Sequence, residues 1–256
     1  MSNEPNGGFH WRTALITGAA SGIGAACAHT LDAAGIGALI LIDRDDAALS
    51  ATSYRAETVR FAGDVADPAL WQRIAAEAPP AHYGVIAAGV AHAAPITDMD
   101  LAPWRATLST NLDGAFLALQ CLLRMMSAED GGAIVTLASA TGFKAEVGTA
   151  AYGASKAGLI QLSRVAAKEG SASGVRVNCL APGGVDTQMW DKSPGFDTLC
   201  SEHGSRAAAI AIMGAATPLG RFATAEEIAA QALFLLSDAA ATITGAVLTS
   251  DGGYSL

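Results

Sequence analysis

Short apolar runs rich in β-branched residues alternate with longer helix-patterned segments along almost the whole chain. Strand, helix, strand repetition implies right-handed crossovers, so it predicts a parallel sheet with helices on both faces. The runs are apolar nearly throughout, as expected for strands buried on both sides. The expected strands are residues 13–17, 38–42, 58–61, 85–88, 133–137, 175–180 and 246–249. The expected helices lie near residues 22–34, 68–77, 103–127, 151–169 and 224–237.

The chain is expected to form a single α/β domain over residues 9–256, preceded by a flexible leader at residues 1–8. Hydrophobic residues make up 51% of the chain and charged residues 15%, which is enough apolar material for one large core. The leader is polar and Gly-rich, so it does not resemble a signal peptide. Residues 183–221 form one long irregular region, interpreted as a mobile lid over a substrate pocket or as a plain surface excursion.

Charge and composition also exclude several classes of partner. The formal net charge of -9 opposes binding to nucleic acid, which requires clustered Lys and Arg. No apolar run has the length of a membrane helix, so a cytoplasmic protein without a membrane partner is expected. The four cysteines are widely scattered and are expected to be reduced and mostly buried. No histidine or cysteine spacing indicates a metal site.

The segment T-G-A-A-S-G-I-G follows the first expected strand and opens the first expected helix. Glycine at such a turn lets backbone N–H groups approach a pyrophosphate, and the helix N-terminus adds positive potential. Spaced glycines alone are a weak signal, because turns and tight packing also select glycine. In this context they predict a Rossmann-type dinucleotide site, within a doubly wound sheet of about seven strands. The expected contacts are Gly18, Ser21, Gly22, Ile23 and Gly24.

Asp43 ends the second expected strand, where a carboxylate can accept hydrogen bonds from the adenosine ribose hydroxyls. A 2′-phosphate at that position would meet like charge, so NAD is favoured over NADP. Arg44 leaves an alternative open. If Asp43 rotated away, the guanidinium could pair with a phosphate; otherwise it packs on the adenine or points to water.

Two further strand ends are expected to contact the cofactor. Asp64 and Val65 follow the third strand and could bracket the adenine, although Asp64 could instead cap a helix. Asp67, before Pro68, fits that capping role better. Ala88 and Gly89, at the end of the fourth strand, allow close backbone approach to the cofactor.

Tyr152 and Lys156 are four residues apart in Y-G-A-S-K, so they share one face if residues 151–169 are helical. A nearby ammonium favours the phenolate and is expected to lower the tyrosine pKa toward working pH. Tyr152 would then remove the alcohol proton as hydride leaves for a nicotinamide. Ser139 can hold the substrate oxygen, and Lys156 also binds ribose hydroxyls. Taken singly, a surface Tyr–Lys pair and a turn serine are ordinary features.

These motifs together resemble the short-chain dehydrogenase/reductase family, in its compact single-domain branch. The matching segments are the glycine turn, Asp43, Asp64, N-L-D-G at Asn111, Ser139, Tyr152, Lys156, P-G-G-V-D-T at 182–187, P-L-G-R at 218–221 and the ending S-D-G-G-Y. The resemblance implies that Asn111 interrupts a helix and helps hold a water in a proton relay. It places Pro182, Gly183, Val185 and Thr187 in the cofactor site, the last two at the nicotinamide carboxamide. It also implies a homotetramer, or a homodimer, formed through the helices near 103–127 and 151–169.

Two departures from the family pattern stand out. The family has N-N-A-G after its fourth strand, whereas Ile86, Ala87, Ala88 and Gly89 stand here. The support that the first asparagine gives the sheet is therefore expected to come from apolar packing instead. The segment between the second and third strands is short, which predicts a trimmed second helix.

The expected function is NAD-dependent interconversion of a secondary alcohol and its ketone, the alcohol being a polyol, cyclic diol or hydroxy compound. The alternatives are an NADPH-dependent carbonyl or 3-oxoacyl reductase, and a non-catalytic dinucleotide-sensing protein. The chain also resembles dihydrodiol dehydrogenases, among them one whose substrate carries a carboxylate. Such a carboxylate would have to bind one of a few basic residues: Lys144, Lys192 or Arg206. The candidate substrate contacts are Ser139, Thr141, Glu146, Gly184 and Trp190, with Gly183 and His92 as further possibilities.

Overall fold

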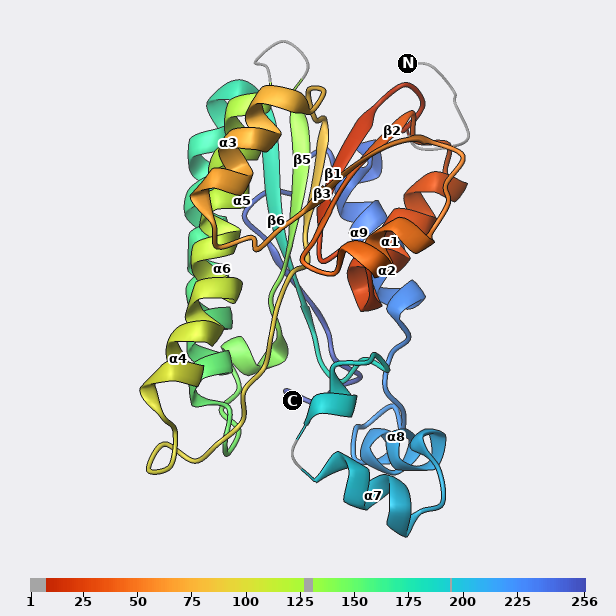
Figure 1. Cartoon of the computed structure of the whole chain (residues 1–256), viewed down its shortest axis with the longest axis vertical. Helices are drawn as coiled ribbons and strands as arrows, with labels where there is room; N and C mark the ends of the chain where they lie inside the picture. The colour runs from red at the N-terminus through yellow and green to blue at the C-terminus, as the bar shows by residue number, and fades with distance from the viewer. Residues whose placement is uncertain (1–7, 127–130, 194) are drawn as a thin grey trace.

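The computed structural model describes residues 8–126, 131–193 and 195–256, and in it seven parallel strands form one sheet in the order β3-β2-β1-β4-β5-β6-β7 (Figure 1). Because β1 pairs with both β2 and β4, the strand order reverses between β1 and β4. Ligands of such sheets bind at that switch point, beyond the carboxyl ends of the strands. The strands are β1 Thr13–Thr17, β2 Ala38–Asp43, β3 Glu57–Ala62, β4 Tyr83–Ile86, β5 Gly132–Leu137, β6 Val175–Pro182 and β7 Val247–Ser250.

Helices cover both faces of the sheet, which confirms the predicted doubly wound α/β fold (Figure 1). One face carries α3, α5 and α6, and the other carries α1, α2 and α9. Within the described residues, none of these helices has the length and apolar character that crossing a membrane requires. The α-helices are α1 Gly22–Ala33, α2 Asp46–Ala51, α3 Pro68–Glu77, α4 Leu101–Leu108, α5 Gly114–Met125, α6 Ala150–Gly170, α7 Phe196–Glu202, α8 Arg206–Ala215 and α9 Ala225–Leu236.

Strand β2 shows how the sequence produces two cores from one sheet. Successive side chains of a strand point to opposite faces. Leu39 and Leu41 accordingly pack into the cluster beneath α1 and α9, while Ile40 and Ile42 pack into the cluster beneath α3, α5 and α6. All four side chains are fully or almost fully buried, which explains the near-continuous apolar runs in the sequence.

Two local expectations about the helices are confirmed, and one boundary is corrected. Helix α2 has six residues, in keeping with the predicted trimmed helix. The long helix expected near residues 103–127 is interrupted by a π-helical turn, Ser109–Asp113, which contains Asn111. Residue 127 lies outside the described residues. Strand β4 ends at Ile86 instead of residue 88, so Ala87 and Ala88 belong to the loop beyond the sheet.

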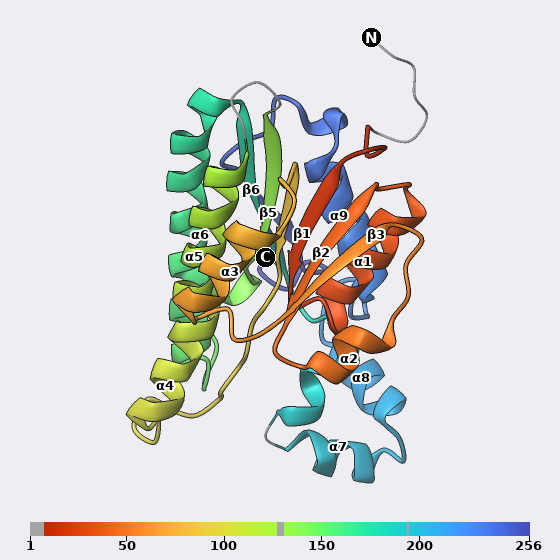
Figure 2. The same cartoon turned by 45° about the horizontal axis from the view of Figure 1, so that its top comes forward.

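The prediction that residues 183–221 are irregular is wrong. The described part of this segment contains a 3-10 turn at Trp190–Lys192, followed by α7 and α8, and Pro194 lies outside it. These helices share a small core of their own, with Phe196, Ala209 and Ile210 buried. They form a separate layer below the carboxyl ends of the strands (Figures 1 and 2). Ser205 caps α8 by accepting a hydrogen bond from the N–H of Ala208, a start signal that was present in the sequence.

Candidate active site

The glycine turn between β1 and α1 packs so tightly against neighbouring backbone that no side chain fits at Gly18 or Gly24. Gly18 has a φ of +69°, and a Cβ there would lie 2.9 Å from the backbone nitrogen of Ala88. A Cβ on Gly24 would overlap the carbonyl oxygen of Gly18. Ser21 precedes α1 and, within the described residues, makes no side-chain capping bond to it. The first-turn N–H groups of α1 are thus available to an anion, and the turn fits a pyrophosphate.

Asp43 is fixed beside this turn by two backbone donors. Its Oδ2 accepts from the N–H of Ala20 at 3.0 Å, and its Oδ1 accepts from the N–H of Asp45 at 3.1 Å. Rotating the carboxylate away would break both bonds. Arg44 is exposed next to it. The fixed carboxylate can accept a hydrogen bond from a ribose hydroxyl, whereas it would repel a phosphate group of the same charge.

The loops after β3 and β4 complete this side of the site. Asp64 is exposed and its Oδ1 accepts from the N–H of Ala66, so it forms a local turn instead of capping a helix. Val65 is buried, and its carbonyl accepts from the Trp71 indole N–H. The capping role belongs to Asp67, as predicted, because its side chain accepts from the N–H of Ala69 at the start of α3.

The departure from N-N-A-G is compensated by a residue that the sequence did not identify. Ile86 is buried in the core, in line with the expected apolar packing. Thr17 at the end of β1 uses its Oγ1 to accept from the N–H groups of Ala87 and Ala88, each at 3.1 Å. These bonds fix the loop after β4 next to the glycine turn. The sequence places Thr17 at the start of the glycine segment but does not predict these bonds, since its partners are about seventy residues away.

Ser139, Tyr152 and Lys156 are brought together at the carboxyl end of β5 and the start of α6. Ser139 accepts from the hydroxyl of Thr141 at 3.0 Å, and its own hydroxyl is hydrogen-bonded to that of Tyr152. The Nζ of Lys156 lies 5.5 Å from the centre of the Tyr152 ring and donates to the Leu137 carbonyl at 2.7 Å. A phenol, a hydroxyl and an ammonium therefore converge where a substrate oxygen could sit.

The electrostatics of this group differ from the sequence-based expectation in one respect. Burial raises the pKa of Tyr152, and the hydrogen bond from Ser139 lowers it in part. Burial also lowers the pKa of Lys156 to about 8. The expectation that Lys156 brings the tyrosine pKa down toward working pH is therefore wrong for the chain by itself, because desolvation of the phenolate raises that pKa and outweighs the hydrogen bond from Ser139.

Asn111 connects the π-helical turn to this group. Its Oδ1 accepts from the N–H of Val90 at 2.8 Å, and its Nδ2 donates to the Val90 carbonyl and to the Ser155 hydroxyl. Ser155 in turn donates to the backbone carbonyl of Tyr152 at 2.7 Å. Gly89 lies alongside, and a Cβ there would lie 3.5 Å from the Nζ of Lys156. Asn111 and Ser155 are buried, so this network joins α6 to the loop after β4.

The segment after β6 faces the glycine turn from the other side. A Cβ on Gly22 would lie 3.5 Å from Cγ2 of Thr187, so the methyl group of Thr187 borders the turn. Pro182 and Val185 are buried, and Val185 forms an isolated parallel bridge with Ala223. A Cβ on Gly183 would lie 2.8 Å from Cα of Asp251 in the C-terminal tail.

The candidate substrate contacts separate into two groups. Thr141 lies next to Ser139, as described above. Trp190 and Gly184 instead pack against Phe222. The Trp190 ring stacks on Phe222 at 5.3 Å and its N–H donates to the Val185 carbonyl, while a Cβ on Gly184 would overlap the Phe222 ring.

His92 is held by a residue that the sequence also did not identify. Its Nδ1 lies 2.9 Å from the hydroxyl of Thr107, which donates to the Pro103 carbonyl. Thr107 therefore accepts from His92, and Nδ1 carries the proton. Thr107 and Asn111 are one turn apart and together fix the loop that leaves β4. No periodicity in the sequence distinguishes Thr107 from an ordinary polar residue on a helix.

The three cations considered for a substrate carboxylate have different environments. Arg206 forms ion pairs with Asp186 and Asp191. Lys144 lies 3.7 Å from Glu146, a predicted substrate contact, and over the ring of Tyr254. Lys192 is exposed on the 3-10 turn. All four cysteines are free, and Cys27, Cys121 and Cys179 are buried, which confirms the expectation for the thiols.

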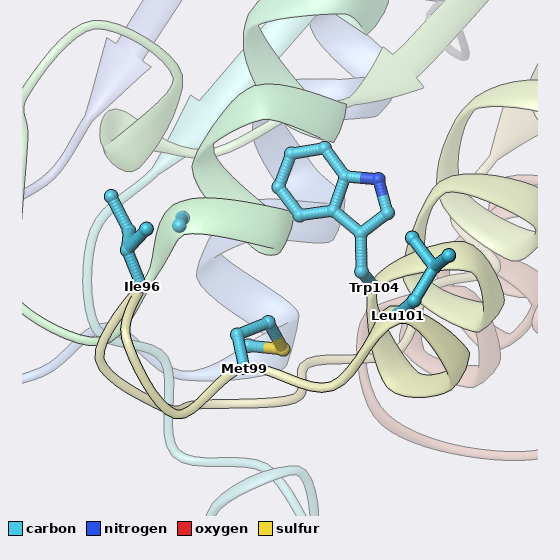
Figure 3. A pocket seen from close by; sticks show the side chains of 5 residues that line it. Ile96, Met99, Leu101 and Trp104 are labelled. Carbon is cyan, nitrogen blue, oxygen red and sulfur yellow. The ribbon is translucent and has the colours of Figure 1, made fainter.

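An apolar cavity of about 230 Å³ lies at the loop after β4 and the start of α4 (Figure 3). Its lining comes from the loop after β4, the start of α4 and the first residue of α6: Ile96, Met99, Leu101, Trp104 and Ala150. None of the reacting groups lines it. Among the described residues no group of His, Cys, Asp and Glu has the arrangement of a metal site.

Comparisons with known proteins agree with this geometry. A family model described as "Enoyl-(Acyl carrier protein) reductase" matches residues 18–255. The cis-4-hydroxycyclohexanecarboxylate dehydrogenase of Sinomonas cyclohexanicum is 40% identical, covering 96% of this chain and 98% of that protein. The D-threitol dehydrogenase of Mycolicibacterium smegmatis is 42% identical, covering 96% and 93%. The crystal structure of L-sorbose reductase from Gluconobacter frateurii, complexed with NADPH and L-sorbose, is 26% identical and has a TM-score of 0.88, covering 98% of both chains.

Proposed function

The chain belongs to the short-chain dehydrogenase/reductase family, and we propose that it is an NAD-dependent member that uses Tyr152 as its general acid/base. It is an oxidoreductase that interconverts secondary alcohols and ketones. The observation that carries the proposal is the convergence of Ser139, Tyr152 and Lys156 beside a glycine turn that excludes side chains. A protein that only senses a dinucleotide would need the turn but not this group.

Each reacting residue has a defined proposed task. When bound, NAD accepts the hydride from the alcohol carbon and contributes the positive charge of its ring. The Oη of Tyr152 takes the alcohol proton, and the hydroxyl of Ser139 donates to the substrate oxygen. Lys156 would bind the ribose hydroxyls. Asn111 holds the loop at Val90 and, through Ser155, the first turn of α6, so it positions Tyr152.

The preference for NAD over NADP is supported by the environment of Asp43. Two backbone N–H groups hold its carboxylate in place. An adenosine 2′-phosphate would approach a fixed negative charge. The exposed Arg44 side chain would offset that repulsion only if it moved to pair with the phosphate. We expect kcat/KM for NAD to exceed that for NADP by about tenfold or more, as about 1.4 kcal/mol of differential binding produces.

The experiment is a screen of secondary alcohols, cyclic diols and polyols, with NAD and with NADP, followed by reduced-cofactor absorbance. Oxidation with NAD as the preferred cofactor supports the proposal. A kcat/KM with NADP that equals or exceeds the value with NAD contradicts it. Such a result would favour the alternative, an NADPH-dependent carbonyl or 3-oxoacyl reductase.

We also propose a homotetramer assembled through α4, α5 and α6. Each of these helices exposes a large apolar side chain, respectively Leu101, Phe116 and Val165. Exposed apolar groups on neighbouring helices are typical of surfaces that associate. Sedimentation velocity tests the assembly, and Phe116→Glu should dissociate it. A monomer at micromolar concentration would contradict this part of the proposal.

A further inference from the structure

We propose that the site selects neutral, hydroxyl-bearing substrates over substrates that carry a carboxylate, because Lys144 and Arg206, two of the three cations considered for a substrate carboxylate, are already paired within the chain. The inference rests on the proposed function and narrows its substrate class. It also separates the two kinds of substrate named for the relatives, a cyclohexanecarboxylate and a neutral tetritol.

Arg206 is the cation best suited in principle to hold a carboxylate, but each of its three nitrogens already donates a hydrogen bond within the chain. Nη1 bonds Asp186 at 2.6 Å, Nε bonds Asp191 at 2.7 Å, and Nη2 donates to the Thr187 carbonyl at 2.8 Å. A carboxylate is recognised by two neighbouring guanidinium nitrogens acting as a fork. Each such pair on Arg206 already includes engaged nitrogens. A substrate anion would have to share nitrogens that already hold Asp186, Asp191 and the Thr187 carbonyl.

Lys144 is engaged in the same way on the opposite side. Its ammonium donates to the backbone carbonyl of Tyr254 and lies 3.6 Å from the centre of that ring. Glu146 lies 3.7 Å from the ammonium and is hydrogen-bonded to the Tyr254 hydroxyl. Lys144, Glu146 and Tyr254 are thus one another's hydrogen-bond and charge partners. Together they attach the C-terminal tail to the loop that carries Ser139.

Lys144 lies next to the loop of Ser139, and Arg206 lies next to the segment that borders the glycine turn. Lys144 follows Ser139 by five residues, with its N–H bonded to the Ala140 carbonyl. Arg206 holds the backbone of Thr187, whose methyl group borders the glycine turn. The residues after β7 contact both sides: a Cβ on Gly183 would lie 2.8 Å from Cα of Asp251, and the ring of Tyr254 lies beneath the Lys144 ammonium.

The charge near these clusters favours a neutral ligand. The ion-paired side chains are the acidic Glu146, Asp186 and Asp191 and the basic Lys144 and Arg206. Three negative and two positive groups leave one net negative charge, within a chain of formal net charge -9. The Arg206 pairs are about 40% exposed, so solvent screens them and they can be displaced. We therefore expect a preference of about tenfold rather than complete exclusion.

The test compares cis-4-hydroxycyclohexanecarboxylate with its carboxamide, which has nearly the same shape and no charge. With NAD, kcat/KM for the amide should exceed that for the carboxylate by about tenfold. The two compounds are also titrated calorimetrically into protein saturated with NADH, where the alcohol cannot be oxidised. The same order of affinity is expected there, so the preference is measured even without turnover.

The variant Asp186→Asn/Asp191→Asn releases Arg206 from both carboxylates and should raise the carboxylate-to-amide ratio by about fivefold or more. The matched control, Glu57→Gln/Glu77→Gln, removes the same charge from exposed positions at the start of β3 and the end of α3. It should leave the ratio within about twofold.

Equal use or binding of the two compounds overturns the inference, as does failure of the amide to bind. A control that moves the ratio as far as the variant also overturns it. Preferential binding of the amide with no oxidation of any alcohol would leave the inference standing and remove the proposed function instead.

Discussion

The start of α6 and the segment after β6 border the same site, yet they are held by different means. Around Tyr152 the supporting side chains are buried: Asn111 and Lys156 bond backbone groups of neighbouring elements, and Ser155 bonds the Tyr152 carbonyl. The segment after β6 depends on a small apolar core and on half-exposed ion pairs of Arg206. Buried bonds are costly to break, whereas exposed pairs exchange with water easily. We therefore expect the reacting groups to be held rigidly, while the segment after β6 can adjust to the substrate.

The largest expected effect comes from placing a methyl group in the rigid region. Gly24→Ala would push a Cβ into the Gly18 carbonyl, so we expect a loss of about 3 kcal/mol in the free energy of unfolding. NAD affinity should fall by about a hundredfold, because the displaced turn carries the phosphate-binding N–H groups. Denaturant titration and calorimetry measure the two quantities.

Gly204→Ala is the matched change in the segment after β6. Gly204 has a φ of +82° but no atom within 4 Å of its Cβ position among the described residues. It should cost about 1 kcal/mol, the price of left-handed backbone alone, with NAD affinity retained. Equal losses for the two variants would contradict the comparison.

A second effect of similar size should appear only as a dependence on pH. Burial lowers the pKa of Lys156 to about 8 from 10.5, so between these values the unfolded chain binds more protons than the folded one. The free energy of unfolding should therefore rise with pH across this window, by up to roughly 3 kcal/mol. Lys156→Met should lack this rise. Parallel stability curves for the two proteins from pH 8 to 10 would show that the ammonium is not buried as described.

The smallest effect is expected at Arg206. Arg206→Lys keeps the charge but cannot make all three bonds, to Asp186, Asp191 and the Thr187 carbonyl. Because these pairs are half exposed, the loss of stability should stay below about 1 kcal/mol. The freed Thr187 backbone should weaken NAD binding by a few-fold. A loss of several kcal/mol would place Arg206 in the rigid region instead.

The same contrast explains what could be predicted from the sequence. The sheet, the glycine turn and the shared face of Tyr152 and Lys156 depend on short-range patterns, so they were predicted correctly. Thr17 and Thr107 act on residues far away in the chain, and a linear pattern carries no record of such contacts. Helix α8 was not predicted although Ser205 marks its start, because the glycines around it and the lack of a nearby strand are typical of an irregular segment.

Electrostatics were the other weak point of prediction. Spacing places Lys156 near Tyr152 but does not show how far both are buried, and burial dominates the pKa of each. Likewise, the sequence indicates that Lys144 and Arg206 are available cations, whereas in the structure they pair with Glu146, Asp186 and Asp191. Charges can be counted from a sequence, whereas their pairing depends on tertiary structure.

The most direct test of the account is Tyr152→Phe, which removes the proposed proton acceptor and keeps the ring. We expect turnover to fall by about a thousandfold or more, while the dissociation constant for NAD changes by less than about twofold. Alcohol oxidation by the unmodified protein should also rise with pH as the phenol titrates, and the residual activity of the variant should lose that rise. Retained turnover with the same pH profile would contradict the assignment of Tyr152 as the acid/base.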